Sequence, residues 1–185
     1  MTVAYFEKDE LEGVVDFMNN VFRYYGLSRK SFSCDYKQGM GELVEGHQIE
    51  AVVMGQRYGD PWTSDLEMME PSSPGWPKFI RVNPVLKWKF SHVWLFLREC
   101  KLPYCRLYDE GYTSLGEANE TQKNPALLQS DGITYKKAHE LVDEDLERVS
   151  RTPSPNASGK AKKLEWRELD EGGKVRKLDL DPPDL

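Results

Sequence analysis

Residues 49–61 read IEAVVMGQRYGDP and join an apolar run to a charged turn. The run Ile49–Met54 has the length and the β-branched content of a buried strand. Gly55 ends the run, and Arg57 and Asp60 follow shortly after it. Because open α/β sheets bind their ligands at the carboxyl ends of parallel strands, this stretch predicts a binding site as well as a strand.

The chain before residue 49 alternates between short apolar runs and amphipathic segments. Val3–Phe6 and Ser31–Cys34 are predicted to be strands, and Glu10–Tyr25 carries its apolar residues on one helical face. Lys37–Glu45 is predicted to be a second, weaker helix. Strands that alternate with helices over short connections are typical of a parallel sheet covered by helices, so the sequence predicts an α/β fold.

Residues 55–85 are rich in proline and glycine and are predicted to form one long loop. Loops of about thirty residues in a compact domain are usually functional or disordered. The aromatic residues Trp62, Trp76 and Phe79 argue against disorder, because disordered segments are poor in such residues. We therefore expect a loop that encloses a ligand.

Beyond this loop, the sequence predicts a short strand at Val85–Leu86 and a helix at His92–Glu99 with Ser91 as its N-cap. The later segment Gly111–Gly116 places two glycines around hydroxyl side chains. Such a segment either lets backbone N–H groups approach a phosphate or forms a tight structural turn. The residues alone leave both interpretations open.

Composition excludes several classes of protein. With 185 residues the chain suits one domain and an appendage, and its net charge of −6 argues against nonspecific binding of nucleic acid. It has neither an apolar run of about 20 residues nor a basic and then apolar leader, so we expect a cytoplasmic protein without a membrane partner. Three cysteines without close pairs suit a reducing compartment, and no Cys/His spacing suits a metal site formed by the protein.

The last part of the chain differs in composition. Thr152–Lys163 has the proline-, serine- and glycine-rich character of a linker, and Leu164–Leu180 alternates weakly around a glycine pair, which allows a marginal hairpin. We therefore expect an α/β domain over residues 1–151, followed by a linker and a disordered tail over residues 152–185.

A series of motifs surrounds the predicted site. In chain order they are GQRYGDP at 55–61, PGWP at 74–77, RVNP at 81–84, VWLFLR at 93–98, PYC at 103–105, LY at 107–108, GYTSLG at 111–116, NP at 124–125 and LERVSR at 146–151. On these motifs the chain resembles eukaryotic-type FAD synthase, the FMN adenylyltransferase of the PAPS reductase-like group, from about residue 3 to residue 151. The resemblance implies an adenine-nucleotide alpha-hydrolase-like, Rossmann-like parallel sheet with helices on both faces.

This family transfers AMP from ATP to FMN and releases FAD and pyrophosphate, with Mg²⁺ accompanying ATP. The resemblance implies that ATP and FMN are the substrates and that Asp60 and Arg81 are catalytic. Asp60 matches the acidic residue that hydrogen-bonds the flavin ring. The residues that the resemblance implies for flavin binding are Gly55, Arg57, Asp60, Trp76, Arg81, Arg148 and Arg151. Those that it implies for ATP binding are Phe6, Glu7, Gly55 and Arg57.

One feature of the family is missing from this sequence. The family begins with a strand that enters a phosphate-binding loop of the type Gly-Gly-Lys-Asp, whereas Val3 already corresponds to its second strand. We therefore expect a sheet without its first strand, in an N-terminally truncated domain. An incomplete gene product, a sheet that closes differently, and a partner chain that supplies the strand are the three explanations.

Simpler interpretations exist for the same residues. Arg57 and Asp60 could pair across a turn, Trp76 could be ordinary core, and Arg148 and Arg151 could lie on a solvated helix face. At the level of function, one alternative is a non-catalytic module that binds flavin nucleotides. Another is a relative of the sulfonucleotide reductases, for which Cys105 is the nearest candidate nucleophile.

Overall fold

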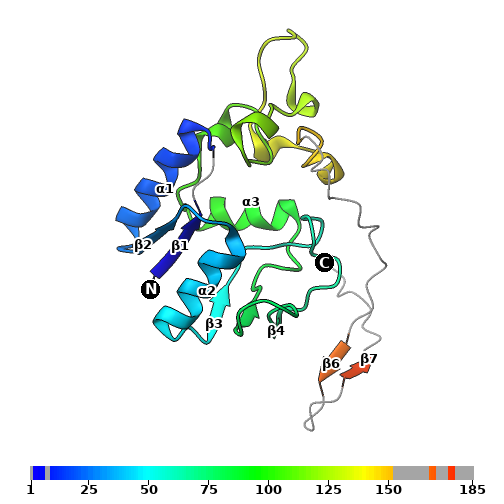
Figure 1. Ribbon diagram of the computed structural model, residues 1–185. Helices are drawn as coiled ribbons and strands as arrows, with labels where there is room; N and C mark the ends of the chain where they lie inside the picture. Colours follow the sequence, from blue (N-terminus) through cyan, green and yellow to red (C-terminus); the bar gives the residue numbers. More distant parts are fainter. Residues whose placement is uncertain (1, 7–8, 152–166, 170–174, 178–185) are drawn as a thin grey trace.

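Two small sheets with parallel strand pairs form the framework of the protein (Figure 1). The computed structural model describes residues 2–6, 9–151, 167–169 and 175–177. Its helices are α1 (Glu12–Tyr24), α2 (Tyr36–His47) and α3 (Phe90–Glu99). Its strands are β1 (Thr2–Phe6), β2 (Ser28–Phe32), β3 (Ala51–Val53), β4 (Met69–Pro71), β5 (Ile80–Val82), β6 (Arg167–Leu169) and β7 (Val175–Lys177). The predicted α/β class is confirmed, and so are the predicted strand at the N-terminus and the first three predicted helices.

The strands do not pair as one parallel sheet within the described residues. β1 pairs in parallel with β2, while β3 pairs in parallel with β5, which also pairs antiparallel with β4. The second sheet therefore has the order β3-β5-β4 and is mixed rather than parallel. The antiparallel pair of β6 and β7 agrees with the hairpin predicted for the tail.

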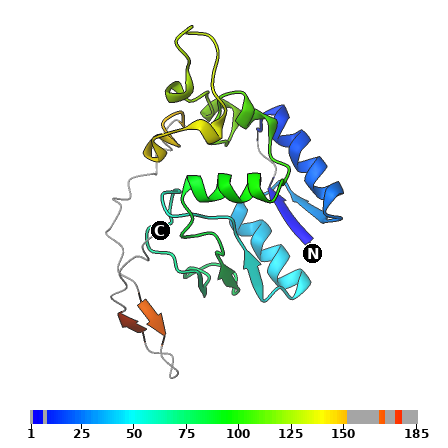
Figure 2. The same ribbon diagram turned by 180° about the vertical axis from the view of Figure 1, so that it is seen from behind.

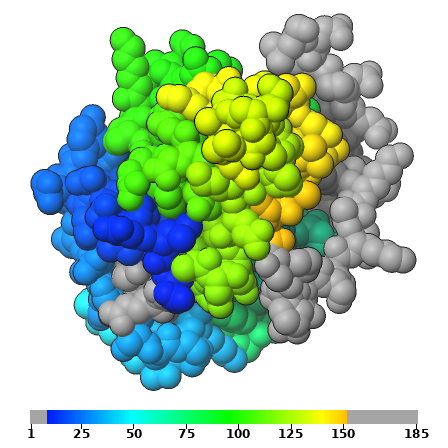
Figure 3. Space-filling model, turned by 90° about the horizontal axis from the view of Figure 1, so that it is seen from above, coloured from blue at the N-terminus to red at the C-terminus, as the bar shows by residue number. Residues whose placement is uncertain are grey.

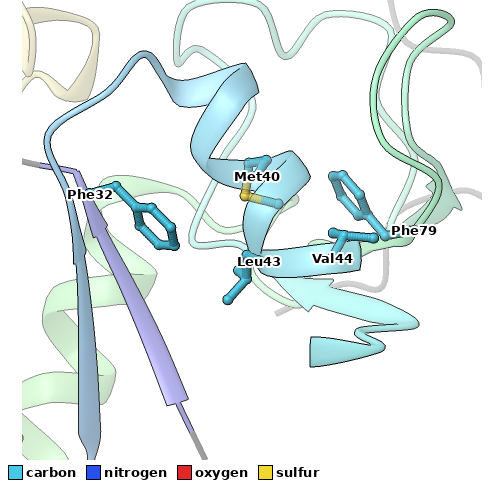
Figure 4. Close-up of a cluster of buried hydrophobic side chains, with 5 residues drawn as sticks. All are labelled: Phe32, Met40, Leu43, Val44 and Phe79. Carbon is cyan, nitrogen blue, oxygen red and sulfur yellow. The ribbon is translucent and has the colours of Figure 1, made fainter. Parts of the chain in front are cut away.

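Helix α2 joins the two sheets through a shared core (Figure 4). Asp35 caps the helix, because its carboxylate accepts hydrogen bonds from the backbone N–H groups of residues 37 and 38 at 3.0 and 3.1 Å. The buried face of α2 carries Met40, Leu43 and Val44, which have the spacing of one helical face. Phe32 of the first sheet and Phe79 beside the second complete the cluster.

A second core surrounds α3. Its buried residues Phe90 and Trp94 pack against Leu127, Ala138 and Leu141 of the segment that follows. That segment has no α-helix or strand between residues 100 and 151; it contains five short 3-10 helices, η1 (Arg106–Asp109), η2 (Ala118–Glu120), η3 (Pro125–Leu127), η4 (Ala138–Glu140) and η5 (Glu144–Leu146). In both ribbon views α3 lies between this segment and the β3–β5–β4 sheet (Figures 1 and 2). From above, the same segment forms much of the visible surface beside α1 (Figure 3).

The strand predicted over residues 49–54 is present but shorter, and the prediction that it is buried is wrong. Only Ala51–Val53 form a strand, and Val53 is 69% exposed. Val53 lies opposite Val82 in the sheet, and Val82 lies opposite Met69, which is 66% exposed. The reason is that, within the described residues, β3 pairs on one side alone and no element covers this face of the sheet.

Three local predictions also need correction. The loop at 55–85 is interrupted by β4 and β5, and the predicted strand at Val85–Leu86 is a turn. Helix α3 begins two residues earlier than predicted, with Lys89 rather than Ser91 as N-cap. The backbone N–H of Ser91 instead donates to Glu144 at 3.1 Å. None of the helices within the described residues is long and apolar enough to cross a membrane.

The contact between α1 and η1 gives a test of this packing. A Cβ added to Gly13 of α1 would lie 2.8 Å from Cγ of Leu107, a buried residue of η1. We expect Gly13→Ala to lower the free energy of unfolding by about 1–3 kcal/mol, as overpacking does in a filled core. Gly46→Ala in α2 is the matched control, because nothing lies within 4 Å of its added Cβ; it should raise stability by about 0.5–1 kcal/mol. Equal effects in urea denaturation would contradict the packing of α1 on η1.

Candidate functional site

The turn after β3 forms one wall of a pocket of about 650 Å³. The pocket is lined by residues 57–60, 87–90, 142–145 and 147–148. Residues 57–60 follow the carboxyl end of β3, and residues 87–90 lie between β5 and the first turn of α3. The site therefore lies beyond the carboxyl ends of the parallel strands, where the sequence predicted it.

The 57–60 turn is held by its own hydrogen bonds. The carboxylate of Asp60 accepts from the backbone N–H of Arg57 at 2.8 Å, and the backbone N–H of Asp60 donates to the carbonyl of Arg57 at 3.1 Å. Gly59 has a φ of +94°, a backbone conformation that residues other than glycine rarely adopt. The hydroxyl of buried Thr63 donates to the carbonyl of Asp60 at 2.7 Å, which fixes the far end of the turn.

Four charged residues with alternating signs meet in the pocket, and we call Arg57, Asp60, Glu147 and Arg148 the charge quartet. Arg57 forms an ion pair with Glu147, and Nη1 of Arg148 lies 3.2 Å from Oδ1 of Asp60. Both pairs join the turn after β3 to the segment after η5. Arg57 and Asp60 do contact each other across their turn, through the backbone N–H of Arg57, but the guanidinium group of Arg57 pairs with the distant Glu147.

Burial shapes the electrostatics of the quartet. Desolvation raises the pKa of Glu147, and the neighbouring charge of Arg57 opposes that rise. The Arg57 and Glu147 side chains are 15% and 17% exposed, so each needs the other as a partner. Chemically, the two guanidinium groups are donors for an anion, and the carboxylate of Asp60 is an acceptor for an N–H group.

Several lining residues were not predicted from the sequence. They include Glu147, whose carboxylate completes the quartet, and Lys87, Trp88 and Lys89 on the wall before α3. The ring of Trp88 contacts that of Phe96 at a centroid distance of 5.3 Å. The run of alternating lysine and aromatic residues at 87–90 is a signal that could have pointed to this wall.

Arg81 and Trp76 lie outside the pocket of the charge quartet. Nη1 of Arg81 donates to Glu70 at 2.6 Å, and its Nε is buried without a partner among the described residues. The ring of Trp76 lies 5.7 Å from that of Tyr36, and Trp76 lines a separate hollow of about 620 Å³ at residues 50, 71–76 and 78–80. Arg81 does not line the pocket of the charge quartet, so the structure does not bring Asp60 and Arg81 together there.

The other predicted site residues are dispersed. Arg151 lies 3.5 Å from Glu120 and packs on Gly116, where an added Cβ would meet its guanidinium group. Gly55 is exposed after β3, and Phe6 pairs through its backbone with Phe32 of β2. Glu7 lies outside the described residues. Arg148 and Arg151 are not on a solvated helix face, because their segment is a turn and both side chains are partly buried.

The structure favours a structural turn for Gly111–Gly116. Thr113 and Ser114 are buried, and the hydroxyl of Thr113 donates to the carbonyl of Glu147 at 2.6 Å. The hydroxyl groups that were candidates for a phosphate site are therefore directed into the protein.

The chain shares a domain with known proteins. Residues 19–123 match the phosphoadenosine phosphosulfate reductase domain. The chain belongs to this family. Over 145 residues it is 39% identical to a probable FAD synthase of Schizosaccharomyces pombe, a match that covers 78% of this chain and 54% of that protein. Over 150 residues it is 35% identical to a probable FAD synthase of Caenorhabditis elegans, covering 78% and 29%.

A solved structure gives the same picture of the fold. The crystal structure of Candida glabrata FMN adenylyltransferase superposes with a TM-score of 0.75 at 23% identity, over 82% of this chain and 68% of that one. At this identity the likeness establishes the fold alone. The chain spans about half the length of the S. pombe relative, so it corresponds to part of that protein.

Within this PAPS reductase domain, Cys105 is not suited to act as a nucleophile. It is buried, and its thiol donates to the carbonyl of Gly13 at 3.3 Å. Burial raises the pKa of the thiol, which disfavours the reactive thiolate. The interpretation that made Cys105 a reductase nucleophile therefore fails on this geometry.

The described residues also contain no group of three or more His, Cys, Asp or Glu side chains that could hold a metal ion.

The raised pKa of Glu147 predicts a pH dependence of stability. The folded state binds this proton more tightly than the unfolded state, whose pKa is near the ordinary value of 4.5. The resulting stabilisation is complete below that pH and is lost as the pH rises through the folded pKa. Glu147→Gln should remove this loss, so the unfolding free energy of the variant minus that of the unmodified chain should increase with pH from about 4.5 upward. A difference that is constant with pH, measured by urea denaturation, would contradict this account of Glu147.

Proposed function

We propose that this chain contributes the flavin side of an FMN adenylyltransferase, which transfers AMP from ATP to FMN to give FAD and pyrophosphate. The observation that carries the proposal is the charge quartet in a pocket beyond the carboxyl ends of β3 and β5. The relatives at 35–39% identity are named as probable FAD synthases, which supports the same reaction class. The volume of about 650 Å³ is within the range of pockets that hold small molecules and cofactors.

The reaction needs two anions to be held together. An oxygen of the FMN phosphate attacks the α-phosphorus of ATP, the new P–O bond forms, and the bond to the departing pyrophosphate breaks. Such chemistry depends on positioning and charge neutralisation more than on covalent catalysis. Arg57 and Arg148 are suited to the flavin phosphate, because guanidinium groups bind phosphate through two parallel hydrogen bonds. Asp60 would then accept a hydrogen bond from the flavin ring.

Binding of a phosphate by the quartet requires an exchange of partners. In the structure Glu147 forms an ion pair with Arg57, and Asp60 forms one with Arg148. A phosphate that binds these arginines would replace one or both carboxylates. The cost of separating an ion pair is offset only where the new partner is itself an anion. This requirement favours a ligand with a phosphate over one with an uncharged tail.

Mg²⁺ would arrive with ATP and neutralise the charge of its phosphates. Mg²⁺ is commonly held by substrate phosphates, water and one or two carboxylates rather than by a complete protein cage. Asp143 and Asp145 at the edge of the pocket suit this limited part. For the nucleotide we propose the residues that the resemblance implies, which are Phe6, Glu7, Gly55 and Arg57. Arg81, Trp76 and Arg151 would join the flavin site only after a rearrangement of the groups in which they lie.

A second candidate function is a module that binds flavin nucleotides without catalysis. It is supported by the same charge quartet, which offers donors for a phosphate and an acceptor for a ring N–H group without requiring a transfer step. The two functions differ in whether FAD forms from FMN and MgATP. If FMN binds but no FAD forms from FMN and MgATP, this chain acts as the binding module.

Flavin binding tests the site directly. FMN should lose fluorescence on titration with the chain, and Asp60→Ala or Arg148→Ala should raise its Kd at least tenfold, because each removes a hydrogen bond that involves a charged group. Arg106→Ala is the matched control, since Arg106 forms an exposed pair with Glu110 away from the pocket and should leave Kd unchanged. A flat titration with the unmodified chain would rule out both candidate functions.

We further propose that an additional strand, from a partner or from a longer form of the chain, completes the sheet between β1 and β3. The support is that these two strands lie in separate sheets on either side of the α2 core. Short parallel pairs are weak when they stand alone. Backbone amides of β1 and β3 should therefore exchange hydrogen much faster than those at the centre of α2. Equal protection of these amides in mass spectrometry would remove the need for another strand.

A further inference from the structure

The segment that carries half of the charge quartet has little regular structure of its own. Glu147 and Arg148 follow the single turn η5, and the chain around them is held by turns such as that from the N–H of Arg151 to the carbonyl of Arg148 at 3.0 Å. A segment of this kind needs outside contacts to keep two charged side chains in a fixed position.

Two buried polar side chains make those contacts. The amide group of Asn124 donates to the carbonyl of Leu146 at 2.8 Å and to the hydroxyl of Thr113 at 2.7 Å. The hydroxyl of Thr113 in turn donates to the carbonyl of Glu147 at 2.6 Å. Asn124 and Thr113 are 0% and 2% exposed, so these bonds are shielded from water. We call these two residues the carbonyl clamp.

The carbonyl clamp is itself firmly held. The side-chain oxygen of Asn124 accepts from the backbone N–H of Ala126 at 2.9 Å, and the backbone N–H of Asn124 donates to the carbonyl of Gly111 at 2.8 Å. All the hydrogen-bonding groups of the Asn124 side chain are therefore satisfied. A buried polar network in which every member has a partner is rigid and specifies one conformation.

The carbonyls that the clamp holds are those of consecutive residues, 146 and 147. The second of them belongs to Glu147, the partner of Arg57, and the next residue is Arg148, the partner of Asp60. No side chain of the clamp lines the pocket. Its effect on the pocket must therefore pass through the backbone of the segment after η5.

We propose that Thr113 and Asn124 are positioning residues, which set the geometry of the pocket by fixing the backbone from which Glu147 and Arg148 extend. The effect on ligand affinity rests on the proposed function, whereas the fixing of the backbone does not. Through the clamp, the Gly111–Gly116 and Asn124–Pro125 motifs contribute to the geometry of the site, although no residue of either motif lines the pocket.

Two isosteric or conservative variants separate the clamp from ordinary packing. Thr113→Val keeps the shape of the side chain and loses the hydroxyl, while Thr113→Ser keeps the hydroxyl; Thr113→Ala serves where the valine variant does not fold. Hydrogen exchange of the whole chain should become at least tenfold faster at residues 146–151 in Thr113→Val and stay unchanged in α2. Thr113→Ser should behave like the unmodified chain. Unchanged exchange at residues 146–151, or faster exchange throughout the molecule, would overturn the clamp whatever the flavin experiments show.

A titration with FMN then tests the effect on the pocket. Thr113→Val should raise the Kd for FMN about tenfold, and Thr113→Ser should restore it. In an Arg148→Ala background the valine substitution should have little further effect, because residues that act through one another are not additive. An equal loss in both backgrounds would show that Thr113 does not act through Arg148. If the unmodified chain does not quench FMN, the proposed function fails, while the exchange experiment still decides the clamp.

Discussion

Arg57 and Glu147 are charged, largely buried and paired with each other, and the arrangement of the pocket depends on that pairing. Removing one member of a buried ion pair leaves an uncompensated charge and costs about 3–5 kcal/mol. The ion pair therefore holds the turn after β3 against the segment after η5, although Arg57 and Glu147 are ninety residues apart in the chain. The second pair, between Asp60 and Arg148, is more exposed than the first. It orients these two side chains more than it stabilises the fold.

The same pairing satisfies the charged groups of the pocket within the protein itself. Each guanidinium group has a carboxylate partner inside the protein, so neither is left unpaired before an anion binds. Burial also opposes the charge of Glu147, since desolvation raises its pKa. A phosphate that takes over Arg57 would leave the carboxylate of Glu147 without its partner, and protonation of Glu147 would then remove the unpaired charge. The site thus favours exchange of one anion for another over binding of a neutral group.

Much of the fold could be predicted from the sequence, because helices and strand ends are local properties. The apolar spacing of Glu10–Tyr25 and the apolar run before Gly55 identified real elements, and the position of Arg57 and Asp60 after a strand identified a real pocket. Exposure of β3 could not be predicted, since it depends on what lies beside the strand rather than on its residues. Glu147 was missed for a related reason: only the fold shows which charges lie opposite each other.

The pocket joins parts of the molecule that are held by different means. The turn after β3 follows the sheet that packs on α2. Phe90 at the start of α3 belongs to the core around Trp94, and the backbone at Glu147 is held by the carbonyl clamp. Asn124 lies next to Pro125 and Leu127, and Leu127 is buried against the Trp94 core, so the clamp and that core are continuous. The sheet side is joined to this unit by the chain between β5 and α3 and by the two ion pairs of the turn after β3. A ligand that bridges Arg57 and Arg148 would therefore tie the sheet to the α3 core. This arrangement gives the ion pairs a structural role, because they connect the turn after β3 to the segment after η5.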